Sequence, residues 1–136
     1  MTNRLSAYAP HALSVLRIAT ALLFFESGVF QLFHWPASNF PPPPPEMVTL
    51  MFAAGVLEFV GGALLVIGLL TRPTAFVLSG MMAVAYWGFH FPMGPWPATN
   101  MGMPAILFCF VFLYLVFAGP GAWAVDTLRH GRTAIA

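Results

Sequence analysis

The sequence predicts an all-α integral membrane protein whose four helices form an antiparallel bundle. Its composition is the first reason, because 60% of the 136 residues are hydrophobic and only 7% are charged, whereas soluble domains average about 25% charged residues. Four long apolar runs, separated by segments rich in proline or glycine, are the second. The third is an uneven distribution of arginine between the segments that flank these runs. The net charge of +1 gives no reason to expect nucleic acid as a partner.

The first apolar run covers residues 12–33, and a helix of about 20 residues crosses a ~30 Å hydrocarbon core. It is too long for the core of a signal peptide and no small-residue cleavage site follows it, so we expect a retained helix. Residues 35–45 form the next loop, in which the prolines of residues 41–45 favour extended polyproline II structure. We interpret this loop as a stiff connector at the surface, in preference to a docking site for a proline-binding partner.

The remaining helices are predicted over residues 47–70, 73–91 and 102–118. Pro73 suits the first turn of its helix, and a glycine–proline–glycine stretch at residues 119–121 ends the last one. Residues 122–136 are expected to be a polar tail. All 136 residues then belong to one membrane domain.

Arginine occurs only in the two tails, within the first helix and in the turn at residues 71–73, whereas the other two loops contain neither arginine nor lysine. Four spans place both tails and this turn on the same side of the membrane. The positive-inside rule makes that side cytoplasmic, so we expect both termini in the cytoplasm. Short connections favour an up-down-up-down bundle.

The second apolar run carries a carboxyl group among small residues. On a helix, Gly55 lies one turn before Glu58, and Gly61 and Gly62 lie one turn after it. Small residues allow a second helix to approach closely in lipid. A carboxyl at bilayer depth is costly and generally faces the protein interior. Glu58 is therefore either a functional group or a neutral carboxyl that holds helices together by hydrogen bonding, and both interpretations stay open.

Other polar residues recur at helical spacing and predict a polar seam. Glu26 and His34 share one stripe of the first helix: Glu26 lies about two turns in from the outer end, and His34 lies at that end. Tyr86 and His90 share one stripe of the third helix. Together with Glu58, and with Gln31 and Asn100 as further candidates, they would line a small-molecule pocket that runs from mid-membrane to the outer mouth. The alternative for both histidines is interfacial packing at the helix ends.

Several classes of chemistry lack their sequence signals. Cys109 is the single cysteine, so no internal disulfide or CxxC pair can form. Two isolated histidines without ligand spacing do not predict a metal or haem site. No phosphate-binding glycine loop, HExxH motif or nucleophile elbow is present. We therefore expect no intrinsic cofactor, and an enzymatic role would need a lipid-soluble cofactor or a partner subunit.

One block of the second apolar run has a specific pattern: Gly55-x-Leu57-Glu58-x-x-Gly61-Gly62 followed by Gly68-Leu69-x-Thr71-Arg72. In this block the chain resembles the DoxX family of small bacterial four-helix membrane proteins. Supporting matches are the early Leu16-Arg17-Ile18, Gly28, Leu32, Gly119-Pro120-Gly121 and Asp126. The resemblance spans residues 15–126, and it identifies Arg17, Glu58 and Arg72 as family residues.

This resemblance implies a bacterial inner-membrane protein associated with quinone or thiol redox systems. The related DoxD proteins are membrane subunits of a thiosulfate:quinone oxidoreductase. The chain departs from the family pattern in having Gln31 where a lysine is frequent, and Gly102-Met103-Pro104 where an acid is frequent. The run of prolines also differs from the usual loop.

Two functional hypotheses follow. In the first, the protein is a subunit that binds a quinone or a similar apolar ligand between its helices and supports a redox partner. Glu58 and Glu26 would then exchange protons with the ligand, and the two histidines would connect the pocket to the periplasm. In the second, it is a non-catalytic assembly subunit of a larger membrane complex, and its glycine face only packs helices. Association with a second copy stays open in both.

Overall fold

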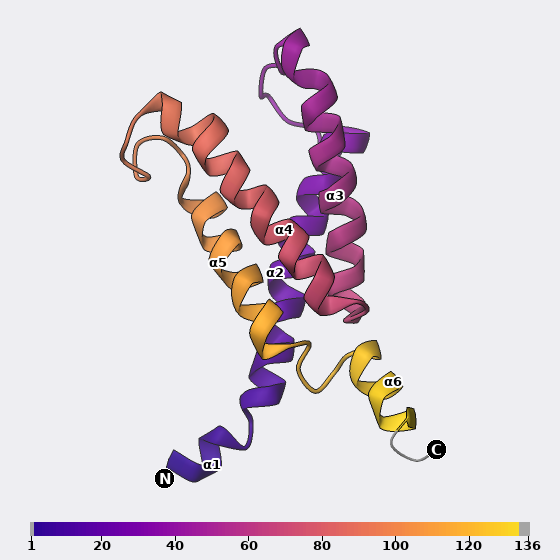
Figure 1. Ribbon diagram of the computed structural model, residues 1–136. Helices are drawn as coiled ribbons and strands as arrows, with labels where there is room; N and C mark the ends of the chain where they lie inside the picture. The colour runs from indigo at the N-terminus through magenta and orange to yellow at the C-terminus, as the bar shows by residue number, and fades with distance from the viewer. Residues whose placement is uncertain (1, 134–136) are drawn as a thin grey trace.

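The computed structural model describes residues 2–133, and every regular element in that part of the chain is helical, which confirms the predicted all-α class (Figure 1). Two long helices come first, α2 (Ala9–Phe33) and α3 (Val48–Ile67), followed by α4 (Thr71–Ala85) and α5 (Met103–Ala118). Shorter pieces flank them: α1 (Thr2–Ser6), η1 (Pro45–Met47), η2 (Tyr86–His90), η3 (Phe91–Met93) and α6 (Val125–Thr133).

Three helical stretches are long and apolar enough to cross a membrane: Ala9–Phe33, Pro45–Ile67 and Thr71–Met93. The apolar helix α5 is shorter, with 16 residues. The chain is thus a multi-pass membrane protein. The third stretch continues past α4 through a π-helical turn, η2, and a 3₁₀ turn, η3.

The long helices form two hairpins, α2 with α3 and α4 with α5, and the hairpins diverge toward one end of the molecule (Figure 1). The divergent end carries residues 34–47 and 91–102, and we call it the proline end. At the opposite end lie α1, α6 and the turn between α3 and α4. We call this the arginine end. Buried apolar side chains join the hairpins, chiefly Ala21, Phe24, Leu65, Leu78, Phe112 and Leu115.

The first hairpin is close-packed because glycine faces the partner helix. A Cβ atom on Gly28 would collide with the backbone of Glu58 and Phe59 in α3. In the other direction, a Cβ on Gly62 would lie 2.8 Å from the backbone of Phe25 in α2. Gly55 faces side chains of α2, those of Gln31 and Leu32, whereas Gly61 faces Leu78 of α4. The small residues predicted to admit a second helix are therefore used inside the chain.

Arg17 lies in the core of the arginine end, with none of its surface exposed. Its guanidinium donates to the carbonyl oxygens of Pro120 and Trp123, the latter at 2.6 Å. The sequence alone allows Arg17 either to snorkel to the cytoplasmic surface or to reach across toward Glu58, and in the structure it does neither. The loop between α5 and α6 folds over this side chain, and its carbonyl groups accept from both terminal nitrogens of the guanidinium, whereas Nε is buried without a partner among the described residues.

Two further residues join the elements of the arginine end. Arg72, in the first turn of α4, donates to the carbonyls of Val116 and Phe117 at 2.5 and 2.8 Å, where α5 ends. The carboxylate of Asp126 accepts from the backbone N–H groups of Leu70 and Thr71 at 2.9 and 2.8 Å. It therefore caps the start of α4 from another helix, which is favourable for an anion at a helix N-terminus.

The C-terminal region differs from the prediction. A polar tail was expected over residues 122–136, but Val125–Thr133 forms α6, and residues 134–136 lie outside the described part. The helix is held at its start, where the N–H of Asp126 donates to Gly68 at 2.9 Å. Gly68 adopts a left-handed conformation, with φ of 69°, and a Cβ there would clash with Ala124. These tertiary contacts, which no local pattern shows, order the segment.

Candidate ligand site at the proline end

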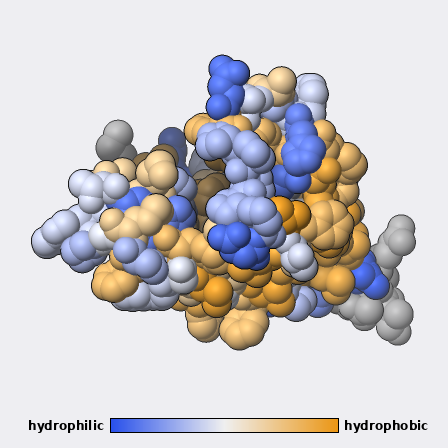
Figure 2. Space-filling model, turned by 90° about the horizontal axis from the view of Figure 1, so that it is seen from above, coloured by the Kyte–Doolittle hydropathy of each residue, from blue (hydrophilic) through white to orange (hydrophobic). Residues whose placement is uncertain are grey.

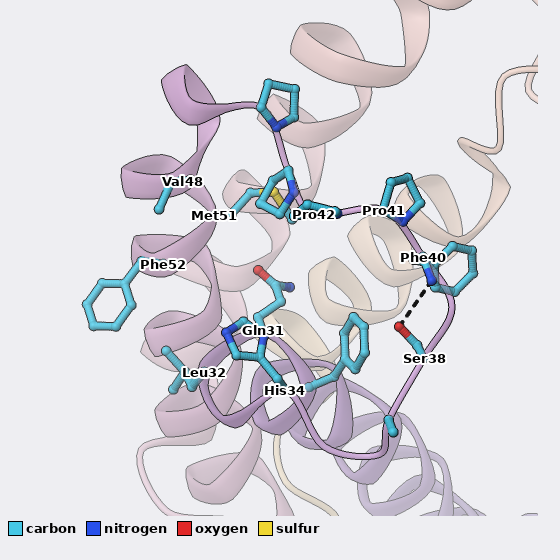
Figure 3. A pocket seen from close by; sticks show the side chains of 14 residues that line it. Gln31, Leu32, His34, Ser38, Phe40, Pro41, Pro42, Val48, Met51 and Phe52 are labelled. Carbon is cyan, nitrogen blue, oxygen red and sulfur yellow. Dashed lines mark hydrogen bonds between the residues drawn. The ribbon is translucent and has the colours of Figure 1, made fainter.

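A pocket of about 820 Å³ lies at the proline end, between the ends of α2 and α3 and the segment that joins them. The proline segment arches over it as a stiff wall, and apolar side chains from both helices form the remaining sides (Figure 3). The lining includes Phe30, Leu32, Phe40, Val48, Met51 and Phe52. Figure 2 looks onto this end, where hydrophilic loop residues gather above hydrophobic side chains. The segment predicted to be only a connector therefore also shapes a cavity.

Glu58 lies at the base of this region, 6% exposed. Its Oε2 accepts a hydrogen bond of 2.6 Å from the amide nitrogen of Gln31 in α2. The same nitrogen is 3.5 Å from the hydroxyl of Ser27, one turn earlier. Because Gly28 and Gly55 allow the helices to approach closely, these short polar side chains can meet across the interface.

The amide of Gln31 links Glu58 to the pocket. Since its nitrogen donates to the carboxyl group, its carbonyl oxygen faces the other way, and Figure 3 shows the side chain reaching into the cavity below the prolines. His34, the residue that ends α2, lines the same cavity with its exposed ring. The pocket thus combines apolar walls with an acceptor and an imidazole, the usual arrangement of a small-molecule site.

The other predicted site residues are not part of this cluster. Glu26 is exposed on the side of α2 that faces away from α3. Tyr86 is buried in the second hairpin, where its ring packs against Gly102. His90 lies beside it, with Nδ1 3.0 Å from the carbonyl oxygen of Asn100. The single seam predicted from spacing is therefore divided, because the two hairpins diverge at the proline end.

Gln31 and Asn100 were further candidates for the predicted seam, but the sequence did not pair Gln31 with Glu58. Only the depth of Gln31 near the end of α2 could have suggested this pairing. Asn100 is 1% exposed and binds Gly94 and Gly102 in the loop before α5. Among the described residues, no three His, Cys, Asp or Glu side chains lie together as metal ligands would.

Comparisons with known proteins show which proteins are similar to this chain. The family model DoxX matches residues 12–91, which cover all but the first turn of α2 and the whole of α3 and α4. The chain belongs to the DoxX family. An uncharacterized protein of Haemophilus influenzae is 39% identical over 127 residues, covering 91% of this chain and 95% of that protein. No solved structure matches the chain.

Two other relatives are named as membrane proteins. An uncharacterized membrane protein of Mycobacterium tuberculosis is 28% identical over 138 residues, covering 90% of this chain and 83% of its own. The inner membrane protein YqjF of Escherichia coli is 34% identical over 77 residues, covering 57% and 59%. The matched DoxX region contains both Gln31 and Glu58, so the candidate site lies within the family domain.

Proposed function

We propose that this DoxX protein is a bacterial inner-membrane subunit that binds a quinone, or an apolar ring ligand of similar size, in the pocket at the proline end. The observation that carries the proposal is the Gln31 amide, fixed by Glu58 at the base of an apolar pocket. A cavity of about 820 Å³ is within the usual range for small-molecule sites, roughly 300–1,000 Å³.

The polar groups of the pocket suit a ring that carries oxygen on its edge. The carbonyl oxygen of Gln31 accepts hydrogen bonds, which suits a ligand hydroxyl, and an imidazole N–H of His34 can donate to a ligand carbonyl. A bound quinone would supply two-electron redox chemistry for a partner protein. The chain's own part is to orient the ring, exclude water with its apolar walls and hold a proton at the Glu58 carboxyl.

The proposal includes a topology. If α5 also spans the membrane, four spans place both chain ends on one side, with the arginine end in the cytoplasm. The pocket then opens at the periplasmic end of the molecule. Its apolar wall, where Met51 and Phe52 are exposed, would meet the outer part of the bilayer, from which a lipid-soluble ligand can enter.

The alternative is an assembly subunit whose glycine face docks a larger complex. Gly28, Gly55 and Gly62 already pack α2 against α3, and Gly61 packs against α4. A partner would therefore have to use other surfaces of the molecule. This occupancy of the glycine face favours the ligand-binding role.

The test is to titrate the purified protein with a short-chain benzoquinone and to analyse its organic extract by mass spectrometry. We expect wild-type protein to retain quinone, and Val48→Trp, which fills the pocket without touching Glu58, to lose it. Val84→Trp is the matched control, because Val84 is 69% exposed on α4 and lines no pocket in the described structure.

A second variant tests the polar base of the site. Gln31→Leu removes the only hydrogen-bonding group in the described structure that connects Glu58 to the cavity, and we expect at least about tenfold weaker binding, as for the loss of one buried hydrogen bond. Equal binding by wild type, Val48→Trp and Val84→Trp would contradict the proposed site. Absence of binding by folded wild type would contradict the proposed function.

A further inference from the structure

A second groove, of about 390 Å³, lies at the arginine end, between the end of α3 and the segment that leads into α6. Its lining is apolar and consists of Ile67, Ala122, Trp123, Ala124, Val125 and Leu128. The three largest of these side chains, Ile67, Trp123 and Leu128, are 51%, 55% and 71% exposed. The groove therefore presents apolar surface that the described part of the chain leaves uncovered.

The groove begins where a membrane span ends. Ile67 is the last residue of the stretch Pro45–Ile67, which is long and apolar enough to cross a membrane. Val56, Val60 and Ile67 follow one another at intervals of four and seven, so they share one stripe of α3, and all three are exposed. This lipid-facing stripe thus continues into the groove at the membrane interface, where tryptophan side chains such as Trp123 are enriched.

The walls of the groove are fixed by hydrogen bonds to neighbouring elements. The backbone N–H of Trp123 donates to the hydroxyl of Ser14 at 3.0 Å, and its carbonyl accepts from Arg17 at 2.6 Å. At the start of α6, the N–H of Asp126 donates to the carbonyl of Gly68 at 2.9 Å. Because these contacts order the walls in the absence of a ligand, binding requires little further ordering of the chain.

A cation without a partner lies at the rim of the groove. Val125 and Leu128 line the groove, and Arg129 follows Val125 by four residues, one turn further along the same side of α6. Arg129 is exposed and has no hydrogen bond or ion pair within the described residues. An arginine in such a place lays its aliphatic stem along apolar surface and keeps its guanidinium at the polar edge.

No free carboxylate competes for this cation among the described residues. Asp126 is the acidic residue of the arginine end, and its two oxygens accept from the backbone N–H groups of Leu70 and Thr71. The other three acidic residues of the chain lie in α2, η1 and α3. The rim of the groove therefore keeps an unbalanced positive charge, which attracts an anion.

We propose that this groove binds an anionic phospholipid of the surrounding membrane. The apolar walls at the end of α3 hold part of an acyl chain, and Arg129 binds the phosphate of the headgroup. A zwitterionic phospholipid offers the same chains and phosphate but adds a cation, so the net charge of the headgroup should determine which lipid is retained. The groove shares no residue with the pocket at the proline end, so this proposal and the quinone proposal fail separately.

The first test is native mass spectrometry of the full chain in neutral detergent, with phosphatidylglycerol or phosphatidylcholine of identical acyl chains added stepwise. We expect wild type to bind phosphatidylglycerol about fivefold more tightly, the effect of one cation on an anionic lipid. Arg129→Gln should remove this preference. Arg4→Gln is the matched control, because Arg4 is an equally unpartnered, exposed cation on α1, on the other side of the arginine end from α6 (Figure 1). Equal affinity of wild type for both lipids, or equal effects of the two substitutions, would overturn the proposal.

The second test examines the apolar part of the groove. Leu128→Gln should weaken binding of phosphatidylglycerol about tenfold, as for the loss of one leucine from an apolar contact. Leu5→Gln is its control, because Leu5 is 77% exposed on α1 and does not line the groove. Both positions are exposed, so neither substitution should change the thermal unfolding of the protein. Equal affinity of these two variants for phosphatidylglycerol would contradict the proposed groove.

The third test identifies the occupant in native membranes. A benzophenone attached to Leu128→Cys, in a Cys109→Ala background, should cross-link to phospholipid on irradiation, and mass spectrometry of the adduct identifies the headgroup. We expect anionic headgroups to be enriched relative to the same probe at Leu5→Cys. Cross-linking at position 128 to protein alone, either a second copy or another chain, would overturn the proposal.

Discussion

At the scale of single residues, the structure assigns partners that the sequence leaves undetermined. Spacing correctly indicated that Glu58 faces the protein interior, since a carboxyl among glycines on an apolar helix has few alternatives. Gln31 was a further candidate for the same polar seam, but spacing could not indicate its direct hydrogen bond to Glu58, which is 27 positions away in sequence and lies on another helix. Arg17 was misplaced for the same reason, because the carbonyls that it binds belong to a loop more than 100 positions away.

Asp126 provides a test at this scale through pH. Partial burial raises the pKa of Asp126, but the hydrogen bonds from the N–H groups of Thr71 and Leu70 outweigh it, so the pKa lies below its ordinary value of 3.8. The folded state therefore favours the carboxylate. Its contribution to stability is fully present above about pH 4 and is lost as the pH falls through the lowered folded-state value.

We expect Asp126→Asn to lower the free energy of unfolding by about 1 kcal/mol at pH 7, as for the loss of a helix N-cap. The difference from wild type should shrink progressively below about pH 4, as the carboxylate takes up a proton first in the unfolded state and then, at lower pH, in the folded state. Thermal unfolding in mild detergent between pH 3 and pH 7 measures both effects. A difference that stays constant over this range would show that the charge of Asp126 does not stabilise the start of α4.

At the scale of elements, the apolar runs predicted the long helices well, because length and hydropathy determine which segments can cross a bilayer. The boundaries shifted where tertiary contacts decide them. The second helix was expected to begin at residue 47 and reach residue 70, but α3 ends at Ile67, where the left-handed Gly68 stops it. The π-helical turn η2 and the helix α6 also lack a local signal.

The close contact between α2 and α3 depends mainly on Gly28. A methyl group on Gly28 would lie 2.8 and 2.9 Å from backbone atoms of α3, which cannot move aside as a flexible side chain would. We expect Gly28→Ala to lower the free energy of unfolding by about 1–3 kcal/mol, the usual cost of overpacking. It should also weaken quinone binding, since it moves Gln31 away from Glu58.

Gly80→Ala is the matched control, because Gly80 lies inside α4 and a Cβ there would meet nothing within 4 Å. This substitution should be neutral or stabilising by up to about 1 kcal/mol, as alanine favours helix more than glycine does. Unfolding in mild detergent and quinone titration of both variants provide the comparison. Equal stability of the two variants would show that α2 and α3 are not held at the distance seen here.

At the scale of the whole molecule, two hairpins are fastened at the arginine end and separate toward the proline end. The sequence predicted an antiparallel bundle but not this divergence, because apolar surfaces that face lipid and those that face another helix have the same composition. The residues of the predicted polar seam, which come from the first three helices and one loop, are therefore divided between the two hairpins. The contacts at the arginine end should consequently stabilise the fold without affecting ligand binding at the proline end.

Arg17→Met tests this division. The variant removes both hydrogen bonds to the loop of residues 119–124 while filling most of the space, and we expect unfolding to become about 2 kcal/mol easier. Proteolysis at the arginine end should accelerate. Quinone affinity should stay within about twofold, less than the effect of one hydrogen bond. A parallel loss of affinity would mean that the two ends are coupled.

The length of the proline segment also determines how far α3 is offset along the axis of α2. Because polyproline advances about 3.1 Å per residue, it starts α3 well beyond the end of α2, and only this offset brings Glu58 level with Gln31. Removing two of the five prolines would shorten the segment by about 6 Å, close to one helical turn of 5.4 Å. Ala54 would then stand opposite Gln31, so the length of a loop determines which residue meets the site.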